Sequence, residues 1–138
     1  MVHLVRTGIS LESDLLERFD RVIQKKGYNN RSEAIRDLVR DCVVAEEVEA
    51  DRSVVGSLTM VYDHHRPQLS ERLIHLQHHA HAKVLAATHV HLDHRNCLEV
   101  VIMKGRSSDM KRLADQILSL RGVKHGKIVF TSQVGGRA

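Results

Sequence analysis

The spacing of apolar residues predicts one strand and two helices in the first 45 residues. Alternation over residues 2–11 favours a short strand, and helical spacing follows over residues 14–26, with Ser13 as the expected N-cap. A second helix is predicted from Asn30, where Glu33 three positions later resembles a capping box. Three such elements cannot close a core, so we predict that two copies pair their strands and pack their helices.

The rest of the chain alternates between strand and helix patterns. After a charged tail or hinge at residues 45–53, the predicted elements are a strand at 54–62, a helix at 66–83 opened by Pro67, strands at 85–92 and 97–103, a helix at 108–120, and a strand at 127–132. The order β-α-β-β-α-β is that of ferredoxin-like domains. We therefore expect an α+β protein with two domains, at residues 1–48 and 53–133.

Composition adds one strong signal and several weak ones. Eleven of the 138 residues are histidine, and eight of these lie from His64 through His91. The net charge of +4 is compatible with a nucleic-acid partner but is weak evidence for one. No apolar run approaches the ~20 residues of a membrane span, and the start lacks the layout of a signal peptide. We expect a soluble, cytoplasmic protein without a membrane partner. Cys42, among apolar residues, is expected to be a small core residue.

The stretch THVHLDHRNCLEV, residues 88–100, predicts a hairpin that gathers metal ligands. His89 and His91 share one face of the first strand, and Cys97 begins the second. Pairing the apolar residues Val90 and Leu98 sets two polar pairs opposite each other, with Cβ atoms ~5 Å apart: His91 with Cys97, and His89 with Glu99. Two imidazoles and a thiolate suit Zn, Cu, Ni or Co, but not Mg or Ca.

A fourth ligand is available from the predicted helix at residues 66–83. Four histidines of this helix are candidates, from the same chain or from a partner: His75, His78, His79 and His81. His64 and His65 are at most a weak accessory site, and His3, His94 and His125 are expected to be ordinary surface residues.

Three stretches together resemble one known family: GYNNRSEAIRDLVR, LQHHAHAKVLAATHVHLDHRNCLEV and MKGRSSDMKRLADQILSLRGVKHG. They are similar to the nickel-responsive transcriptional regulators, which join a ribbon-helix-helix DNA-binding domain to an ACT-type, ferredoxin-like regulatory domain. The similarity runs over roughly residues 4–131. It implies a regulator, not an enzyme, and one Ni(II) ion per subunit.

The resemblance also implies the ligands of that ion. The family holds nickel in a square plane of three imidazoles and one thiolate, which implies His89, His91 and Cys97 from one subunit and His78 from the facing subunit. Supporting groups around the ligands are implied at Tyr62, Gln77 and Glu99. Ala80 interrupts the longer histidine run of the family, which puts extra surface metal sites in doubt.

The same resemblance implies a DNA-reading ribbon. Paired strands would place Arg6, Gly8 and Ser10 in the major groove, although Gly8 lacks the side chain that relatives often carry there. The start of the second helix would hold a phosphate at Asn30, Arg31 and Ser32. A second cation site is implied at Glu33 and Asp37, where a helix cap and a solvated acid are nearly equal alternatives.

The function that these features imply is nickel-dependent repression of nickel-uptake genes. We expect a homotetramer, built as a dimer of dimers, that binds a palindromic operator when Ni(II) is bound. A metal storage or delivery protein for Ni, Cu or Zn explains the histidines equally well, but not the strand-helix-helix start. A zinc hydrolase with Glu99 as its base and a thiol enzyme using Cys97 are weaker alternatives, because four ligands leave no open position and nothing marks an oxyanion site.

Overall fold

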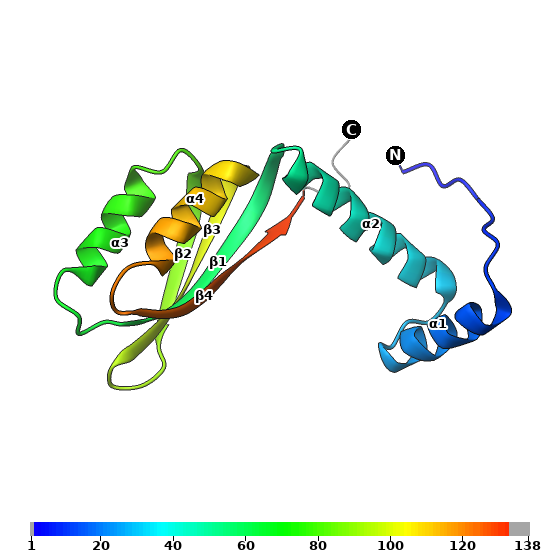
Figure 1. Ribbon diagram of the computed structural model, residues 1–138, viewed down its shortest axis with the longest axis horizontal. Helices are drawn as coiled ribbons and strands as arrows, with labels where there is room; N and C mark the ends of the chain where they lie inside the picture. The colour runs from blue at the N-terminus through cyan, green and yellow to red at the C-terminus, as the bar shows by residue number, and fades with distance from the viewer. Residues whose placement is uncertain (1, 133–138) are drawn as a thin grey trace. The chain divides into compact units, whose positions relative to one another are not determined.

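The structure is a computed structural model that describes residues 2–132, and it divides into two compact units between Asp41 and Cys42. The first unit contains helix α1, Ser13–Lys25, and the first part of helix α2, Arg31–Glu49 (Figure 1). The second unit contains the end of α2 and all of the strands. Within residues 2–132, no helix combines the length and the apolar content that crossing a bilayer requires.

The two N-terminal helices begin close to where the sequence predicts. Helix α1 starts at Ser13 itself, with Glu12 in the cap position and no side-chain cap bond, so the predicted capping role of Ser13 is wrong. The predicted cap of α2 forms, because the Glu33 backbone N–H donates to Asn30 Oδ1 at 3.0 Å. Between the helices, Gly27 adopts φ +84°, a conformation that favours glycine.

The predicted N-terminal strand does not form within one chain. Residues 2–12 carry neither strand nor helix, and most of their apolar side chains are exposed, as Val5 (79%) illustrates. A strand is defined by hydrogen bonds to a neighbouring strand, which a single copy does not supply here. Among the described residues of this unit, only Ile23 and Ala34 are buried apolar residues.

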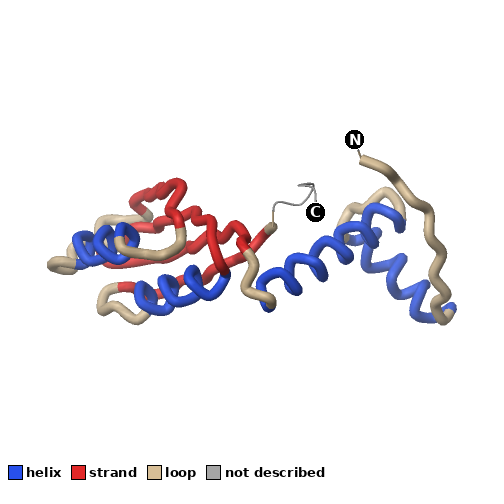
Figure 2. The backbone as a smooth tube through the Cα atoms, turned by 90° about the horizontal axis from the view of Figure 1, so that it is seen from above, coloured by secondary structure: helices blue, strands red, loops and turns tan. Residues whose placement is uncertain are grey.

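The second unit is a four-stranded antiparallel sheet with two helices. Its elements are β1 Ser53–Asp63, α3 Leu69–His78, β2 Lys83–His91, β3 Asn96–Arg106, α4 Ser107–Leu118 and β4 Val123–Thr131. The strand order β2-β3-β1-β4 confirms the predicted ferredoxin-like arrangement, and Figure 2 shows the strands beside the two helices.

The helices pack against one face of this sheet and form the core. Alternate residues of β1 point to that face, including Leu58 and Met60, which have no exposed surface. Leu73 of α3 and Met110 of α4 complete the same buried cluster. The opposite face keeps several apolar residues in solvent: Val90, Ile102 and Val129.

Helix α3 is shorter than the predicted span of residues 66–83. It starts at Leu69 because Gln68 has a left-handed backbone conformation, φ +67°, which no α-helix continues. It ends at His78, after which Ala82 is buried with its Cα close to the position that a side chain on Gly105 would take. His81 therefore lies outside the helix, contrary to the prediction.

Residues 45–53, predicted as a helix tail or a hinge, begin as the tail of a helix and are anchored at their end. Helix α2 runs through Glu49, and Asp51 follows with φ +56°. The Asp51 carboxylate accepts from the Ser108 backbone N–H at 2.7 Å and pairs with Arg106 at 2.9 Å. The Ser107 hydroxyl donates to the Val48 carbonyl at 2.6 Å. The last turn of α2 is thus tied to the first turn of α4.

Candidate metal centre

The hairpin of β2 and β3 has the register that the sequence predicts. Val90 pairs with Leu98, His91 with Cys97, and His89 with Glu99. The three candidate ligands His89, His91 and Cys97 therefore lie on one face of neighbouring strands. This face is the one that the helices cover, since Cys97 belongs to the buried core cluster.

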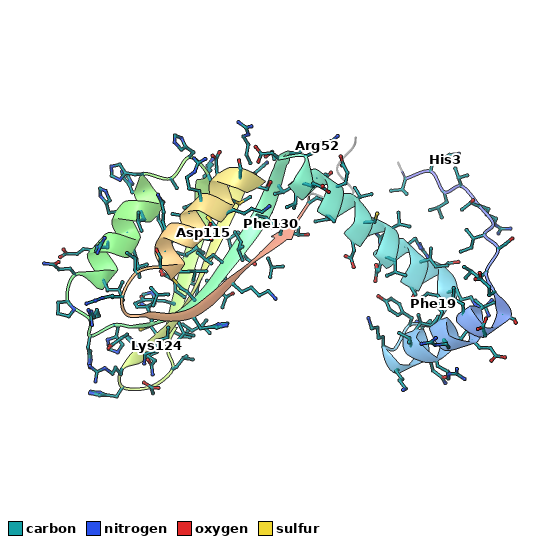
Figure 3. The ribbon with its side chains drawn as sticks, viewed as in Figure 1. His3, Phe19, Arg52, Asp115, Lys124 and Phe130 are labelled. Carbon is teal, nitrogen blue, oxygen red and sulfur yellow. The ribbon has the colours of Figure 1, made fainter. Side chains whose placement is uncertain are left out.

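A side-chain turn fixes where this hairpin reverses. Asp93 Oδ1 accepts from the backbone N–H groups of Arg95 and Asn96, each at 2.8 Å, and Asn96 Nδ2 donates to Asp93 Oδ2 at 2.9 Å. These bonds hold the pKa of Asp93 at about 2. Lys124, which lies at this end of the sheet in Figure 3, donates to Asn96 Oδ1. A fixed turn fixes the register and so sets His91 beside Cys97.

His91 and Cys97 form the closest pair of candidate ligands. His91 Nδ1 lies 3.2 Å from Cys97 Sγ, and Cys97 is only 1% exposed. Burial is the main cause that raises the pKa of the Cys97 thiol, and the carboxylates of Glu99 and Asp93 raise it further. A metal ion that binds this thiol must displace its proton.

His64 joins this pair, which the sequence did not predict beyond an accessory role. One ligand atom from each of His64, His91 and Cys97 lies within 4.8 Å of the others. His64 follows β1, its backbone N–H donates to the Arg95 carbonyl at 3.1 Å, and its Nε2 lies 2.9 Å from the His94 carbonyl. The available signal was the HH pair at the end of a strand that pairs with the Cys97 strand.

His89 faces the same side but stands apart from this compact group. Its ring centroid lies 6.2 Å from that of His91, and it is opposite Glu99 on the neighbouring strand. Burial raises the pKa of Glu99, and the nearby His89 works against that shift. His89, His91 and Cys97 all line one hollow of about 450 Å³ between the sheet and α3.

All three of the predicted supporting residues, Tyr62, Gln77 and Glu99, line the same hollow as the ligands. Tyr62 pairs with Cys97 across β1 and β3, and burial, followed by Glu99 and Cys97, raises its pKa to about 12. Gln77 reaches the hollow from α3. Tyr62 therefore keeps its proton at neutral pH and can act as a hydrogen-bond donor beside the thiol.

His78 is not brought to these residues within one chain. It is exposed in the last turn of α3 and borders a separate hollow together with His81 and Lys83. The described part of the chain thus gathers nitrogen and sulfur donors at one place without His78. This donor set fits a borderline or soft divalent ion such as Ni, Cu or Zn.

The residues predicted to contact DNA lie in the N-terminal unit. Arg6, Gly8 and Ser10 are exposed in the segment before α1. Arg31 is held by Asp20 through two bonds of 2.8 and 2.7 Å, and Asn30 is occupied as a helix cap. Ser32 accepts a bond from Arg36 through its backbone carbonyl.

The predicted second cation site already has protein partners. The Tyr28 hydroxyl donates to Asp37 at 2.7 Å, and Arg40 donates to the same carboxylate at 2.9 Å. The Tyr28 bond is the main cause that lowers the pKa of Asp37. The Asp37 carboxylate thus already accepts two protein hydrogen bonds, and the second cation site at Glu33 and Asp37 stays a prediction.

Comparisons with known proteins agree on both halves of the chain. Residues 5–46 match the family described as "Ribbon-helix-helix protein, copG family", and residues 55–131 match "NikR C terminal nickel binding domain". A protein of Trichlorobacter lovleyi, described provisionally as a nickel-responsive regulator, is 52% identical over 133 residues, 96% of either chain. One of Thermococcus kodakarensis with the same description is 50% identical over 129 residues, 93% of this chain and 94% of its own.

Among solved structures, the ACT domain of a GTP pyrophosphokinase from Chlorobium tepidum matches 56% of this chain with a TM-score of 0.48 and 9% identity, covering 99% of that domain. The two family matches and the relatives confirm the predicted resemblance and the prediction of a regulator rather than an enzyme. The chain belongs to the family of nickel-responsive regulators, with an N-terminal ribbon-helix-helix domain and a C-terminal domain of the nickel-binding type.

Proposed function

We propose that this chain represses nickel-uptake genes by binding a palindromic operator when it holds Ni(II), and that it works in the cytoplasm. The observation that carries the proposal is the 3.2 Å approach of His91 Nδ1 to the buried Cys97 thiol. That pair belongs to a chain whose residues 5–46 match a ribbon-helix-helix domain. A site that needs a second copy for completion links metal binding to assembly, and assembly to DNA binding.

The proposed ligands are His89, His91 and Cys97 from one chain and His78 from a second copy, with one ion per subunit. Ni(II), when bound, would prefer a square-planar arrangement of three imidazoles and one thiolate, whereas Zn prefers a tetrahedral one. The chain's own residues prepare the site: the Asp93 turn holds the register, and Tyr62, Gln77 and Glu99 line the hollow. The exposure of His78, away from Cys97, supports its use by another chain.

A homotetramer, as a dimer of dimers, would cover the apolar surfaces that one copy leaves bare. Leu38 and Val39 of α2 are 57% and 56% exposed, which supports pairing of two ribbon-helix-helix units. Val90 and Ile102, on the open face of the sheet, support a second contact between regulatory domains. We divide the chain at residues 1–48 and 53–133 for these two roles.

DNA contact is proposed for the paired N-terminal segments and the start of α2. Arg6 would fork onto a guanine, Ser10 would bond a base edge, and Gly8 would let the backbone approach closely. Asn30, Arg31 and Ser32 would face a phosphate through free backbone N–H groups. The bidentate bond to Asp20 makes the Arg31 side chain a rigid support rather than a free phosphate ligand.

The central experiment titrates the purified protein with Ni(II) and records absorption together with binding to DNA selected from a random pool. We expect a sulfur charge-transfer band, and DNA binding that strengthens at least tenfold, or about 1.4 kcal/mol, with nickel. Cys97→Ser should lose both, whereas Cys42→Ser, at an exposed cysteine, should keep both. DNA affinity that ignores nickel in the native protein would contradict the proposal and favour metal storage or delivery.

A complementation experiment tests the shared site. His78→Ala and Cys97→Ala chains each lack one proposed ligand, so each chain expressed by itself should lack the sulfur charge-transfer band. Co-expressed as mixed assemblies, a His78→Ala chain still receives His78 from its Cys97→Ala neighbour, and about a quarter of the native band should return for a two-fold interface. No return of the band would place all ligands in one chain.

A pair of variants separates the two histidines that compete for the third position. His89→Ala should abolish the band, while His64→Ala should leave it with at most a shifted wavelength. The opposite result would show that the group of His64, His91 and Cys97 is the one that binds nickel.

A further inference from the structure

We propose that His75, in the last turn of α3, and His79, the residue that caps this helix, bind a second divalent transition-metal ion at a site separate from Cys97. The two residues are four positions apart, so they lie on one face of the helix across a single turn. Both side chains are exposed, on a different face of α3 from Leu69 and Leu73, which are buried in the core.

The geometry of the two rings suits chelation of one ion. Their centroids are 4.1 Å apart and their planes are inclined by 32°. Two imidazoles that bind one ion at right angles, each with a metal–nitrogen distance of ~2.1 Å, have centroids about 4.6 Å apart. A shift of a few tenths of an ångström, well within the freedom of exposed side chains, therefore converts the observed pair into a chelate.

A hydrogen bond sets the required tautomer of His79. Its Nδ1 lies 2.9 Å from the His75 carbonyl oxygen. A carbonyl oxygen only accepts, so Nδ1 carries the proton and Nε2 keeps a free lone pair. Metal-binding histidines commonly donate their other ring N–H to a backbone carbonyl in this way, which orients the ring and raises its basicity.

The surroundings add one favourable and one unfavourable charge. Glu71, one turn before His75, borders with it a hollow of about 350 Å³, and its negative charge favours a cation nearby. Arg72 borders that hollow too, and its cation opposes a metal ion. Two nitrogens with oxygen or water ligands suit Ni(II) or Cu(II) in six-coordinate or tetragonal geometry. Without a thiolate, binding should be weaker than at Cys97.

The position of the site gives it a consequence for the helix. The last backbone bond of α3 runs from the His79 N–H to the His75 carbonyl at 3.1 Å, so an ion held by both rings would close the same turn. That turn also carries His78. A second ion would therefore reduce fraying of the helix end around His78. The effect of this on nickel binding at Cys97 rests on the proposed function, whereas the existence of the second site does not.

The experiment titrates the full-length, metal-free protein with Ni(II) and then with Cu(II), by calorimetry and absorption. We expect a second, weaker binding event without a sulfur charge-transfer band. His75→Gln and His79→Gln should each remove it, while the exposed His125→Gln should retain it. Cys97→Ser should lose the first event but keep the second, so failure of the proposed nickel function and failure of this site are distinguishable.

Two charge variants sharpen the result. Arg72→Ala should tighten the second event several-fold, because it removes a cation beside the ion, and Glu71→Gln should weaken it several-fold. Far-UV circular dichroism confirms that each variant is folded. A single binding event in the native protein would overturn the proposal, and so would a second event that survives in the folded His75→Gln, His79→Gln double variant.

Discussion

The two units of this chain bury their apolar residues to very different extents. The C-terminal unit has a continuous core, in which Leu58, Met60 and Met110 have no exposed surface. The N-terminal unit leaves Leu15, Val22 and Leu38 about half exposed, although the helices that carry them are well formed. One unit thus completes its core within a single chain, and the other leaves an apolar face exposed, which the proposed pairing with a second copy would cover.

The largest expected effect comes from placing a charge on the open apolar face. Leu38→Glu would leave the free energy of association almost unchanged if this side chain stayed in solvent. It would weaken association by about 3–5 kcal/mol if a partner buries the charge without a counter-charge. We expect dissociation of the N-terminal pair, measured by sedimentation, and a loss of DNA binding of more than a hundredfold. Gln24→Glu, an exposed polar position on α1, is the control. A Leu38→Glu protein that assembles and binds DNA normally would remove the contrast between the units.

A smaller effect is expected from a cavity in the closed core. Leu58→Ala should lower the free energy of unfolding by about 2–5 kcal/mol, because the side chain is fully buried. Thr59→Ala, the next residue on the exposed face of the same strand, should change it by no more than about 0.5 kcal/mol. Chemical denaturation measures both. Equal effects of the two substitutions would mean that this sheet face is not the core.

The sequence predicted the hairpin better than any other part of the site. Strict alternation in THVHL and CLEV leaves one register that aligns Val90 with Leu98, and that register alone sets His91 against Cys97. The order of strands and helices was predictable for the same reason, because each element has its own hydrophobic period. The pattern does not say which sheet face the helices cover, since β3 has apolar residues on both: Val101 and Met103 on one, Leu98 and Ile102 on the other.

Contacts that depend on three-dimensional packing were not predictable. His64 reaches Cys97 from 33 positions away in the sequence, through pairing of β1 with β3, and no local period marks it. Helix α3 ends at His78, and Ala82, beyond this end, packs beside Gly105, a contact between distant segments. Residues 2–11 form no strand in one chain because no other described segment offers them hydrogen-bond partners, which the proposed pairing of two copies would supply. In each case the structure depends on atoms far away in the sequence, which a local pattern of residues does not reveal.

The smallest predicted effect concerns the hydrogen bonds that hold the end of α2 against α4 in the C-terminal unit. The bonds from Ser108, with help from Arg106 and Ser107, lower the pKa of Asp51 from 3.8 to about 2. A depressed pKa in the folded state means that this stabilisation is complete above pH 3.8 and is lost as the pH falls through about 2. Asp51→Asn keeps the shape but removes the charge, so it should lower the melting temperature by a few degrees at neutral pH.

Melting temperatures recorded from pH 5 to pH 2 test this point by difference. The native protein should lose more stability than Asp51→Asn over that interval, because only the native chain has this carboxylate to protonate. Hydrogen exchange should also quicken in the variant at residues 46–50, the end of α2, since the neutral amide loses the ion pair with Arg106 and accepts more weakly from Ser108. Parallel pH curves for the two proteins would show that the Ser107 bond to Val48 alone anchors the helix. In that case a single neutral hydroxyl would hold the end of α2 within the C-terminal unit.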